Sequence, residues 1–325
     1  MRKWLESYKG FVPSYGLDAL YGCEYWKTLF QGCIPQEHLD ARFRVPRSHA
    51  FLLYGPAGNG KSTLAHAFAK ELSDVGYSFI HVPGMVLAET PGGIEELFEE
   101  ILSEADTQDA RGVCLLLEWL EVLAGQEEAM WVLNQYICTL KEREIPCIIL
   151  VIVEEFSDVH PFLEKVMIPC QIRLPDKRER KTCIEQMFGD EILLAPGLKY
   201  KDMAEMTEGF SYGRLCDLLR VVRIFLKQKA RRFSGGDGKR LEEMLRQGYV
   251  ILTEEMFADI VNQLKPRSAV VENVPVPDVS AMVSAVSVAQ NPQPVMDNMA
   301  DVMTGFMKEE KDFISSMMDL DLNDL

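Results

Sequence analysis

The chain has 325 residues, 47% of them hydrophobic, which is enough for a sizeable core and for two domains. Its 50 acidic and 34 basic side chains give a net charge of −16, which argues against a broad nucleic-acid-binding surface because duplex affinity depends on neutralising phosphates. No apolar run approaches the roughly 20 residues that span a bilayer, and the N-terminus shows no signal-peptide pattern, so we do not expect a membrane protein.

The eight cysteines form no C-x-x-C pair, and several of them lie inside apolar segments. We therefore expect reduced thiols and a cytoplasmic protein. The five histidines are scattered along the chain, and we interpret each of them as an ordinary side chain rather than a metal ligand.

A glycine-rich loop lies between a predicted strand, residues 50–54, and a predicted helix, residues 62–70. Residues 55–62 match G-x-x-x-x-G-K-[ST], the phosphate-binding loop, whose inward-pointing amides and helix N-terminus hold a phosphate. The pattern predicts that Lys61 reaches the β- and γ-phosphates of ATP and that the Ser62 hydroxyl holds Mg²⁺. The expected phosphate-contacting residues are those of the loop and of the first helical turn: Gly55, Pro56, Ala57, Gly58, Asn59, Gly60, Lys61, Ser62 and Thr63.

Beyond the loop, apolar segments of strand length alternate with segments of helix length. Further strands are predicted at residues 77–82, 113–117, 147–153 and 170–174, with helices at 94–102 and 127–140. Continuous apolar strands separated by helices indicate a parallel sheet that is buried on both faces. We therefore expect an α/β fold: a phosphate-loop parallel sheet covered by helices on both faces, followed by a small helical lid domain.

The composition changes after residue 175 and again after residue 265. The first of these segments predicts helices at 177–188, near 201, at 212–233 and at 253–264. The second is rich in Val, Pro, Ser, Asn and Gln and has no period. The expected organisation is a nucleotide-binding domain at 1–175, a helical lid domain at 176–265, a linker at 266–294 and an acidic amphipathic tail at 295–325.

Two charged segments suggest surfaces for a partner. Basic side chains lie along the predicted helix at 212–233, and we interpret them as a solvated face or as a contact with an acidic neighbour. A local nucleic-acid-binding patch is the alternative. The tail combines acidic residues with methionines at helical spacing. It is a docking helix for a protein partner, a loosely ordered segment, or a helix packed on the protein's own body.

The order of phosphate loop, acidic strand end, further buried strand and helical lid resembles that of the AAA family of ATPases. The likeness covers about residues 15–265 and includes the strand-to-loop junction Leu53–Pro56 and the passage Leu174–Asp176 into the lid. In that family an apolar-x-Gly turn ahead of the core covers the adenine. The resemblance therefore implies base contacts from a leading segment, residues 18–29, through Leu20, Tyr21 and Gly22.

Residues 207–215 resemble the start of the family's lid helix. Many relatives carry an arginine there that touches the γ-phosphate, and Arg214 occupies this position. We leave two interpretations open for Arg214, a phosphate contact and a surface side chain.

The second acidic motif, Walker B, departs from the family pattern of four apolar residues followed by Asp-Glu. Here residues 113–117 are followed by Glu118 and Trp119. The resemblance implies that Glu118 serves Mg²⁺ beside Ser62 and that Lys61 and Glu118 carry any catalysis. Trp119 occupies the position of the water-activating Glu, yet indole has no basic lone pair. This degenerate motif predicts slow or absent hydrolysis, and we expect Glu121 to lie too far along the chain to reach the γ-phosphate.

The strand at 147–153 ends in Glu154 and Glu155, where the family often has a polar residue that places the water. The run 147–155 is an alternative candidate for the acidic motif, although Glu118 has the expected distance from Lys61. The region that supplies arginine fingers in the family holds no Arg between residues 158 and 172, and Lys165 is its only cation. A lysine lacks the planar fork of arginine and is a partial substitute.

The segment after the second strand, residues 84–93, lacks the aromatic residue of polypeptide-threading relatives, so we expect no strong threading grip. Taken together, these features predict an AAA-type protein that binds ATP and hydrolyses it slowly or not at all. We expect it to act as a nucleotide-dependent switch or assembly module. A protein partner or self-assembly is expected. Two alternatives stay open: an active ATPase that remodels a partner protein, and an adaptor that uses the acidic tail.

Overall fold

The computed structural model describes residues 3–105, 112–123, 125–189, 192–234, 239 and 251–265. The chain up to Lys265 forms one compact unit. The expected linker and tail, and most of the segment that joins the last two helices, lie outside the described residues.

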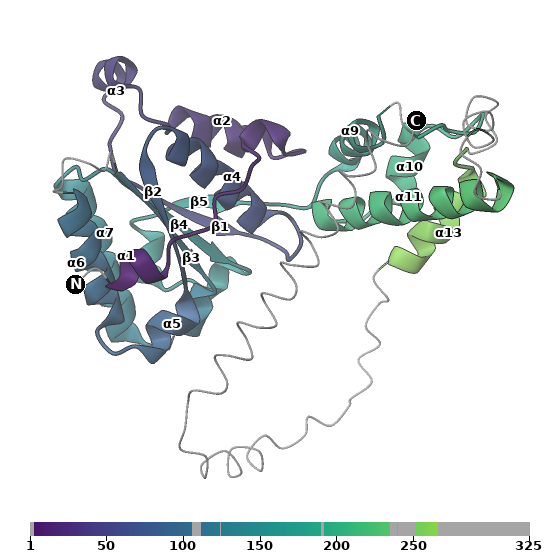
Figure 1. Cartoon of the computed structure of the whole chain (residues 1–325). Helices are drawn as coiled ribbons and strands as arrows, with labels where there is room; N and C mark the ends of the chain where they lie inside the picture. The colour runs from purple at the N-terminus through teal and green to yellow at the C-terminus, as the bar shows by residue number, and fades with distance from the viewer. Residues whose placement is uncertain are drawn as a thin grey trace, which may run out of the picture. The chain divides into compact units, whose positions relative to one another are not determined.

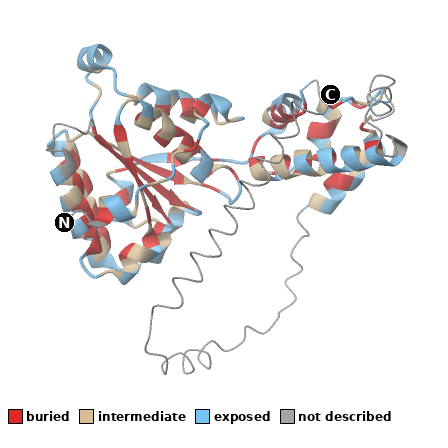
Figure 2. Ribbon diagram, in the orientation of Figure 1, coloured by how far each residue is buried: buried red, intermediate tan, exposed pale blue. Residues whose placement is uncertain are grey.

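Within the described residues a five-stranded parallel sheet has the order β2-β3-β4-β1-β5 (Figure 1). The strands are β1 (His49–Tyr54), β2 (Tyr77–Pro83), β3 (Gly112–Glu118), β4 (Cys147–Val153) and β5 (Ile168–Gln171). Every residue of β3 and β4 is buried, which confirms the expected sheet with both faces covered. Figure 2 shows these central strands in red.

The last strand differs from its prediction. We expected residues 170–174, whereas β5 is Ile168–Gln171 and pairs with β1 alone. Only Cys170 of this strand is buried, so a short edge strand of this kind gives no clear burial pattern from which its bounds could be predicted. Pro169 is tolerated because an edge strand does not need a hydrogen bond from every amide.

Helices cover both faces of the sheet (Figure 1). One face packs against α5 (Gly84–Glu89), α6 (Gly93–Ala105) and α7 (Glu127–Glu142), through side chains such as Leu97, Phe98 and Leu133. The other face packs against α2 (Glu24–Gly32) and α4 (Lys61–Asp74). Phe30 and Phe68 stack there with their ring centroids 4.6 Å apart, which fixes the helix that follows the phosphate loop.

A third cluster of buried side chains belongs to the helices after the sheet. These are α9 (Lys177–Phe188), α10 (Tyr200–Met206), α11 (Tyr212–Ser234) and α13 (Glu254–Leu264). Helix α9 begins at Asp176 with a capping box: the Asp176 carboxylate accepts from the Glu179 amide, and Glu179 accepts from the Asp176 amide. The turn Pro175-Asp176 therefore starts a new helical segment, as the sequence predicts.

Shorter elements complete the described chain. They are the helices α1 (Lys3–Ser7), α3 (Glu37–Phe43) and α8 (Pro161–Glu164) and the 3-10 turns η1 (Leu17–Ala19), η2 (Leu120–Leu123) and η3 (Phe156–Asp158). All eight cysteines are free thiols. None of the described helices combines the length and the apolar character that a membrane crossing requires.

Candidate nucleotide-binding site

The phosphate loop connects β1 to α4 at the carboxyl edge of the sheet. Gly58 and Gly60 have φ of 76° and 82°, a left-handed conformation that glycine adopts readily and other residues avoid. Gly60 is the residue that caps α4, so the first free amides of this helix face the loop. Pro56, Ala57 and Gly58 are exposed and Thr63 lies exposed in the first helical turn, whereas Asn59 is buried.

Two neighbouring strand ends hold the loop in place. The Gly55 amide donates to the Glu154 carbonyl at 3.0 Å, and the Asn59 side-chain amide donates to the Ile172 carbonyl at 3.4 Å. Gly55 has a φ of 139°, and a Cβ atom on it would lie 2.1 Å from the Ile172 carbonyl oxygen. The loop conformation therefore depends on a backbone approach that only glycine permits.

Lys61 lies inside this loop and is 7% exposed. Its ammonium donates to the carbonyls of Gly55 and Pro56. Burial lowers the pKa of Lys61, while the negative charges of Glu154, Glu121 and Glu155 act in the opposite direction. The lysine is thus a partly desolvated cation surrounded by loop carbonyls and carboxylates, which suits it to a phosphate.

Glu118 and Ser62, the two expected magnesium ligands, are brought together. Glu118 is the last residue of β3, and its carboxylate accepts a hydrogen bond from the Ser62 hydroxyl. Burial by itself raises the pKa of Glu118, but the hydrogen bonds from His81 and Ser62 and the charges of His81 and His66 outweigh it, so the pKa lies below its usual value. An ionised carboxylate beside a hydroxyl is a hard-oxygen donor set of the kind that Mg²⁺ prefers.

Two histidines flank this pair, and the sequence analysis missed both. His81 on β2 places Nε2 2.9 Å from Glu118 Oε2. His66 on α4 has Nδ1 2.8 Å from the Ser62 carbonyl, and the two imidazole centroids are 5.5 Å apart. Residues 66 and 81 come from different elements with no motif around them, so only strand pairing and helix packing reveal this cluster.

The chain turns sharply directly after Glu118. Trp119 has a φ of 57°, unusual for a bulky residue, and its side chain is 51% exposed. Its carbonyl lies against Gly84, where a Cβ atom would be only 2.4 Å away. The turn leads into η2, where the Oε2 atom of Glu121 is buried. Glu121 lies within electrostatic reach of Lys61, nearer to the phosphate loop than its place in the sequence suggests.

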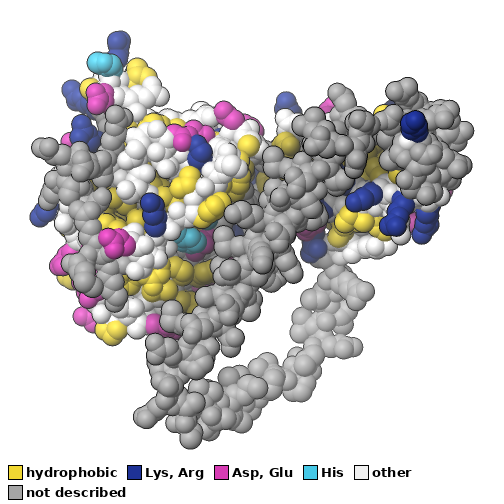
Figure 3. Space-filling view, viewed as in Figure 1, with side chains coloured by type: hydrophobic (Ala, Val, Ile, Leu, Met, Phe, Trp, Pro, Cys, Tyr) yellow, Lys and Arg dark blue, Asp and Glu magenta, His cyan; other side chains and the backbone are white. Residues whose placement is uncertain are grey.

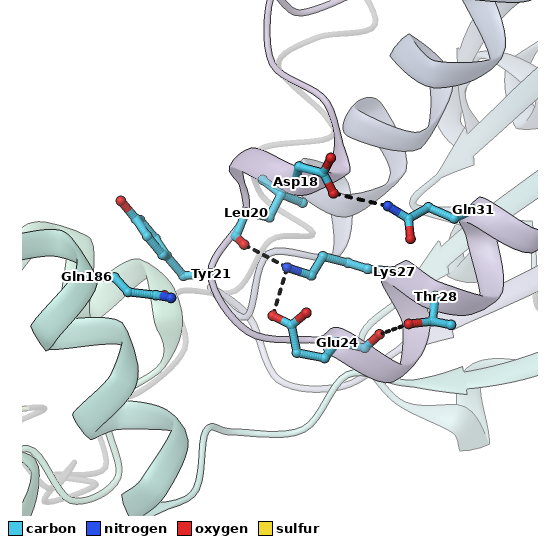
Figure 4. Close-up of a pocket in the computed structure, with 8 residues that line it drawn as sticks. All are labelled: Asp18, Leu20, Tyr21, Glu24, Lys27, Thr28, Gln31 and Gln186. Carbon is cyan, nitrogen blue, oxygen red and sulfur yellow. Dashed lines mark hydrogen bonds and ion pairs between the residues drawn. The ribbon is translucent and has the colours of Figure 1, made fainter.

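The leading segment forms a polar pocket of about 470 Å³ (Figure 4). Leu20 and Tyr21 line it, together with residues of α2 and with Gln186 of α9. Lys27 is buried at its centre, where its ammonium donates to the Leu20 carbonyl at 2.9 Å and pairs with Glu24 at 2.8 Å. Two of the three expected base-contacting residues thus border a cavity that is lined by the leading segment, by α2 and by one residue of α9.

The start of α11 contacts both the leading segment and the phosphate loop. The Gly213 amide donates to the Gly58 carbonyl at 2.8 Å, and a Cβ atom on Gly58 would lie 3.0 Å from Ser211 Oγ. A Cβ atom on Gly22, whose φ is 75°, would lie 2.2 Å from the Tyr212 hydroxyl. Arg214 follows directly and is exposed. The first residues of α11, just before Arg214, therefore contact both Gly22 and the phosphate loop.

The two cationic side chains that follow β4 both lie at the surface, unlike the buried Lys61. Lys165 is the exposed residue that follows α8. Arg173, just beyond β5, forms a two-pronged ion pair with Glu179, both contacts at 2.9 Å. Arg173 is an exposed side chain that pairs with the first turn of α9.

Comparisons with known proteins agree with this geometry. Residues 51–167 match the family model described as ATPase family associated with various cellular activities (AAA). Residues 51–167 therefore resemble an AAA domain. The match begins within β1 and ends just before β5, so it includes the phosphate loop and the strand that carries Glu118. The predicted resemblance to the AAA family is confirmed, and the family match supports nucleotide binding.

A solved structure from work on the structural basis for katanin self-assembly has the same fold. The two superpose with a TM-score of 0.53 and 20% sequence identity, over 78% of this chain and 86% of the katanin chain. A comparison with curated protein sequences gives no match. The structural likeness thus supports the AAA fold of the domain and of the helices that follow it.

The close approach at Gly55 yields a stability prediction. Gly55→Ala should lower the free energy of unfolding by about 2 kcal/mol or more, because the new methyl group meets the Ile172 carbonyl and φ lies outside the range of L residues. Denaturant unfolding followed by circular dichroism measures this. Gly32→Ala is the matched control, since a Cβ there meets nothing within 4 Å, and its stability should stay level or rise slightly. Equal stability of the two variants would contradict the tight fit at Gly55.

Proposed function

We propose that this protein binds Mg·ATP, cleaves it slowly or not at all, and uses the bound nucleotide to set the position of its helical lid. The observation that carries the proposal is the constellation of the buried Lys61 inside the loop and the Ser62–Glu118 pair beside it. A cation suited to phosphate and a pair of oxygen donors suited to Mg²⁺ are adjacent there, which supports a site for a nucleoside triphosphate with its metal.

Each part of the ligand has candidate contacts. The loop amides and Lys61 would hold the β- and γ-phosphates, and Ser62 and Glu118 would hold Mg²⁺. Leu20, Tyr21 and Gly22 would face the base. Bound magnesium would neutralise part of the phosphate charge, while the protein's own groups would orient the phosphates against the start of α4.

Slow cleavage is proposed from the residues just beyond the ends of β3 and β4. Trp119 stands directly after Glu118 and offers neither a base nor a hydrogen-bond acceptor to a water molecule. Glu154 and Glu155, which come directly after β4, are exposed carboxylates, and unpaired negative charge near a triphosphate is repulsive. Lys165 is a point charge without the fork of an arginine finger.

The switch is proposed from the contact between loop and lid. Gly58 belongs to the phosphate loop, and its carbonyl accepts from the Gly213 amide at the start of α11. Any adjustment of the loop around a phosphate therefore acts directly on α11. Arg214, the next residue, is the proposed lid contact to the γ-phosphate and would make the lid sensitive to ATP rather than ADP.

The second candidate is an active ATPase that remodels a partner. It is favoured by the position of Glu121, a further carboxylate close to Lys61. The katanin structure comes from work on self-assembly, which supports the proposal that copies of this chain associate and that a neighbouring subunit completes the site. The adaptor alternative rests on residues 295–325, which lie outside the described residues.

Removing the phosphate-binding cation tests nucleotide binding. Lys61→Ala should weaken Mg·ATP binding by about 1.5–3 kcal/mol, or about 10- to 150-fold, because a charge-assisted contact is lost. Isothermal titration calorimetry measures the affinity. Lys70→Ala, on the same helix but paired with Asp74, is the control and should bind like the unmodified protein. Unchanged affinity after Lys61→Ala would refute the proposed phosphate site.

The cleavage rate separates the two candidate functions. A coupled phosphate-release assay on the unmodified chain should give a turnover well below about 1 per second, the low end of ordinary enzymes. The assay should be repeated over a range of protein concentrations because self-assembly would complete the site. Turnover near or above that value at any concentration would favour the active ATPase.

The proposed contact of Arg214 with the γ-phosphate predicts that its removal weakens ATP binding more than ADP binding. Arg214→Ala should weaken ATP binding about tenfold and leave ADP binding within about twofold, because only ATP has the γ-phosphate. Arg220→Ala is the control on the same helix, where the side chain pairs with Asp217. Figure 3 shows that Lys and Arg side chains gather over α11, so a general loss of positive charge must be distinguished from the specific contact. Equal losses in the two variants would argue against a phosphate role for Arg214.

A further inference from the structure

His81 lies on the same face of the sheet as Glu118. On β2 it comes two residues after Phe79, and on β3 Glu118 comes two residues after Leu116. Phe79 and Leu116 both belong to the buried cluster on the α4 side of the sheet. Because side chains alternate between the two faces of a strand, residues two apart share a face. The imidazole of His81 and the carboxylate of Glu118 therefore both lie on the face that α4 covers.

The side chains of His81 and Glu118 are in direct contact. His81 Nε2 lies 2.9 Å from Glu118 Oε2, which is within ion-pair distance. This nitrogen is shielded from solvent and meets no other acceptor among the described residues. The Glu118 side chain is 10% exposed and the His81 side chain is 26% exposed. The contact therefore joins two largely covered groups and restricts the rotation of the carboxylate.

A second histidine packs against His81 from the α4 side. The ring of His66 meets the ring of His81 edge-on, at an interplanar angle of 84° and with the centroids 5.5 Å apart. It makes a similar contact with Phe79, at 80° and 5.5 Å. Because a carbonyl oxygen only accepts, His66 Nδ1 donates to the Ser62 carbonyl at 2.8 Å. His66 thus links the position of His81 to Ser62, whose hydroxyl is hydrogen-bonded to Glu118.

The length of the Glu118 side chain explains why such a contact matters. The AAA pattern has Asp at this position, and Glu has one more rotatable bond. An unrestrained Glu side chain loses conformational entropy when a ligand fixes it, whereas a restrained one has already lost that entropy on folding. His81 and Ser62 use two of the roughly four lone-pair sites of the carboxylate, so the other sites remain for a metal ion or its bound water.

We propose that His81 is a positioning residue for the metal of the bound nucleotide. It holds the Glu118 carboxylate in the orientation that serves Mg²⁺ beside the Ser62 hydroxyl. The inference rests on the proposed function, because it concerns the metal that accompanies ATP. Replacing a residue that orients a metal ligand typically lowers metal affinity by about 10- to 100-fold. His81 acts through Glu118 and touches neither the metal nor the phosphates.

The test compares two replacements of similar size at position 81. His81→Leu cannot donate to Glu118, whereas the side-chain amide in His81→Gln can. His81→Leu should weaken ATP binding about tenfold with Mg²⁺ and less than about twofold with EDTA, because only the metal complex uses the carboxylate. His81→Gln should bind Mg·ATP within about threefold of the unmodified protein, since the donor is restored. Isothermal titration calorimetry measures these affinities.

The control is a histidine away from the sheet. His38 is an exposed residue of α3, and His38→Leu should leave ATP binding unchanged with Mg²⁺ and with EDTA. Denaturant unfolding of each variant distinguishes a loss of stability from a loss of metal binding. Equal losses of ATP affinity with and without Mg²⁺ in His81→Leu would indicate a structural role alone and would overturn the proposal.

Manganese gives a readout of the metal itself. Electron paramagnetic resonance of free Mn²⁺ measures how tightly the ion binds to protein loaded with a non-hydrolysable ATP analogue. His81→Leu should weaken Mn²⁺ binding about tenfold, and His81→Gln should restore most of it. In a Glu118→Ala background, His81→Leu should have no further effect, because the two residues act as one unit. Losses that add independently would contradict a role exerted through Glu118.

Failure of this inference is distinguishable from failure of the proposed function. If the unmodified chain does not bind Mg·ATP, the proposed function is wrong. If the chain binds Mg·ATP and His81→Leu keeps both the ATP affinity and the Mn²⁺ affinity, the role of His81 is refuted and nucleotide binding stands.

Discussion

The site depends on one backbone arrangement, the clamping of the phosphate loop between the ends of β4 and β5. The Gly55 amide is bound to the Glu154 carbonyl, and the Ile172 carbonyl lies where a side chain of Gly55 would be. These contacts are between main-chain atoms, so they fix the loop without using the side chains that the ligand needs. Lys61, Ser62 and the first amides of α4 then take their positions from the loop.

The charges around that loop are mostly negative. Lys61 is a buried cation, and four carboxylates at the same edge of the sheet have distinct surroundings. Glu118 is hydrogen-bonded, Glu121 is half-buried with a shielded Oε2 atom, and Glu154 and Glu155 are exposed. A triphosphate entering this site would meet one strong cation and an excess of negative charge. In the proposed complex a magnesium ion would therefore have a larger part in neutralising the ligand than in a site with additional arginines.

The hydrogen bond between Gly58 and Gly213 joins the phosphate loop to the helices that follow the sheet. Because both partners are glycines with little space around them, a shift of the loop by a fraction of an ångström changes the hydrogen bond directly. Tyr212, beside Gly213, packs against Gly22 of the leading segment. The leading segment and the phosphate loop therefore both contact the first turn of α11, and this shared contact is the physical basis of the proposed lid response.

The sequence by itself determined the parts that arise from local rules. The alternation of apolar strands and helices predicted the parallel sheet, and the glycine spacing predicted the loop. Both signals depend only on residues that are close together in the sequence. It missed the bounds of β5, whose short edge strand has one buried residue and no periodic signal. Only the tertiary structure placed His81 against Glu118 and Glu121 near Lys61. Those contacts join residues from separate elements, and they depend on strand order and on a one-residue left-handed turn at Trp119, which local propensity does not encode.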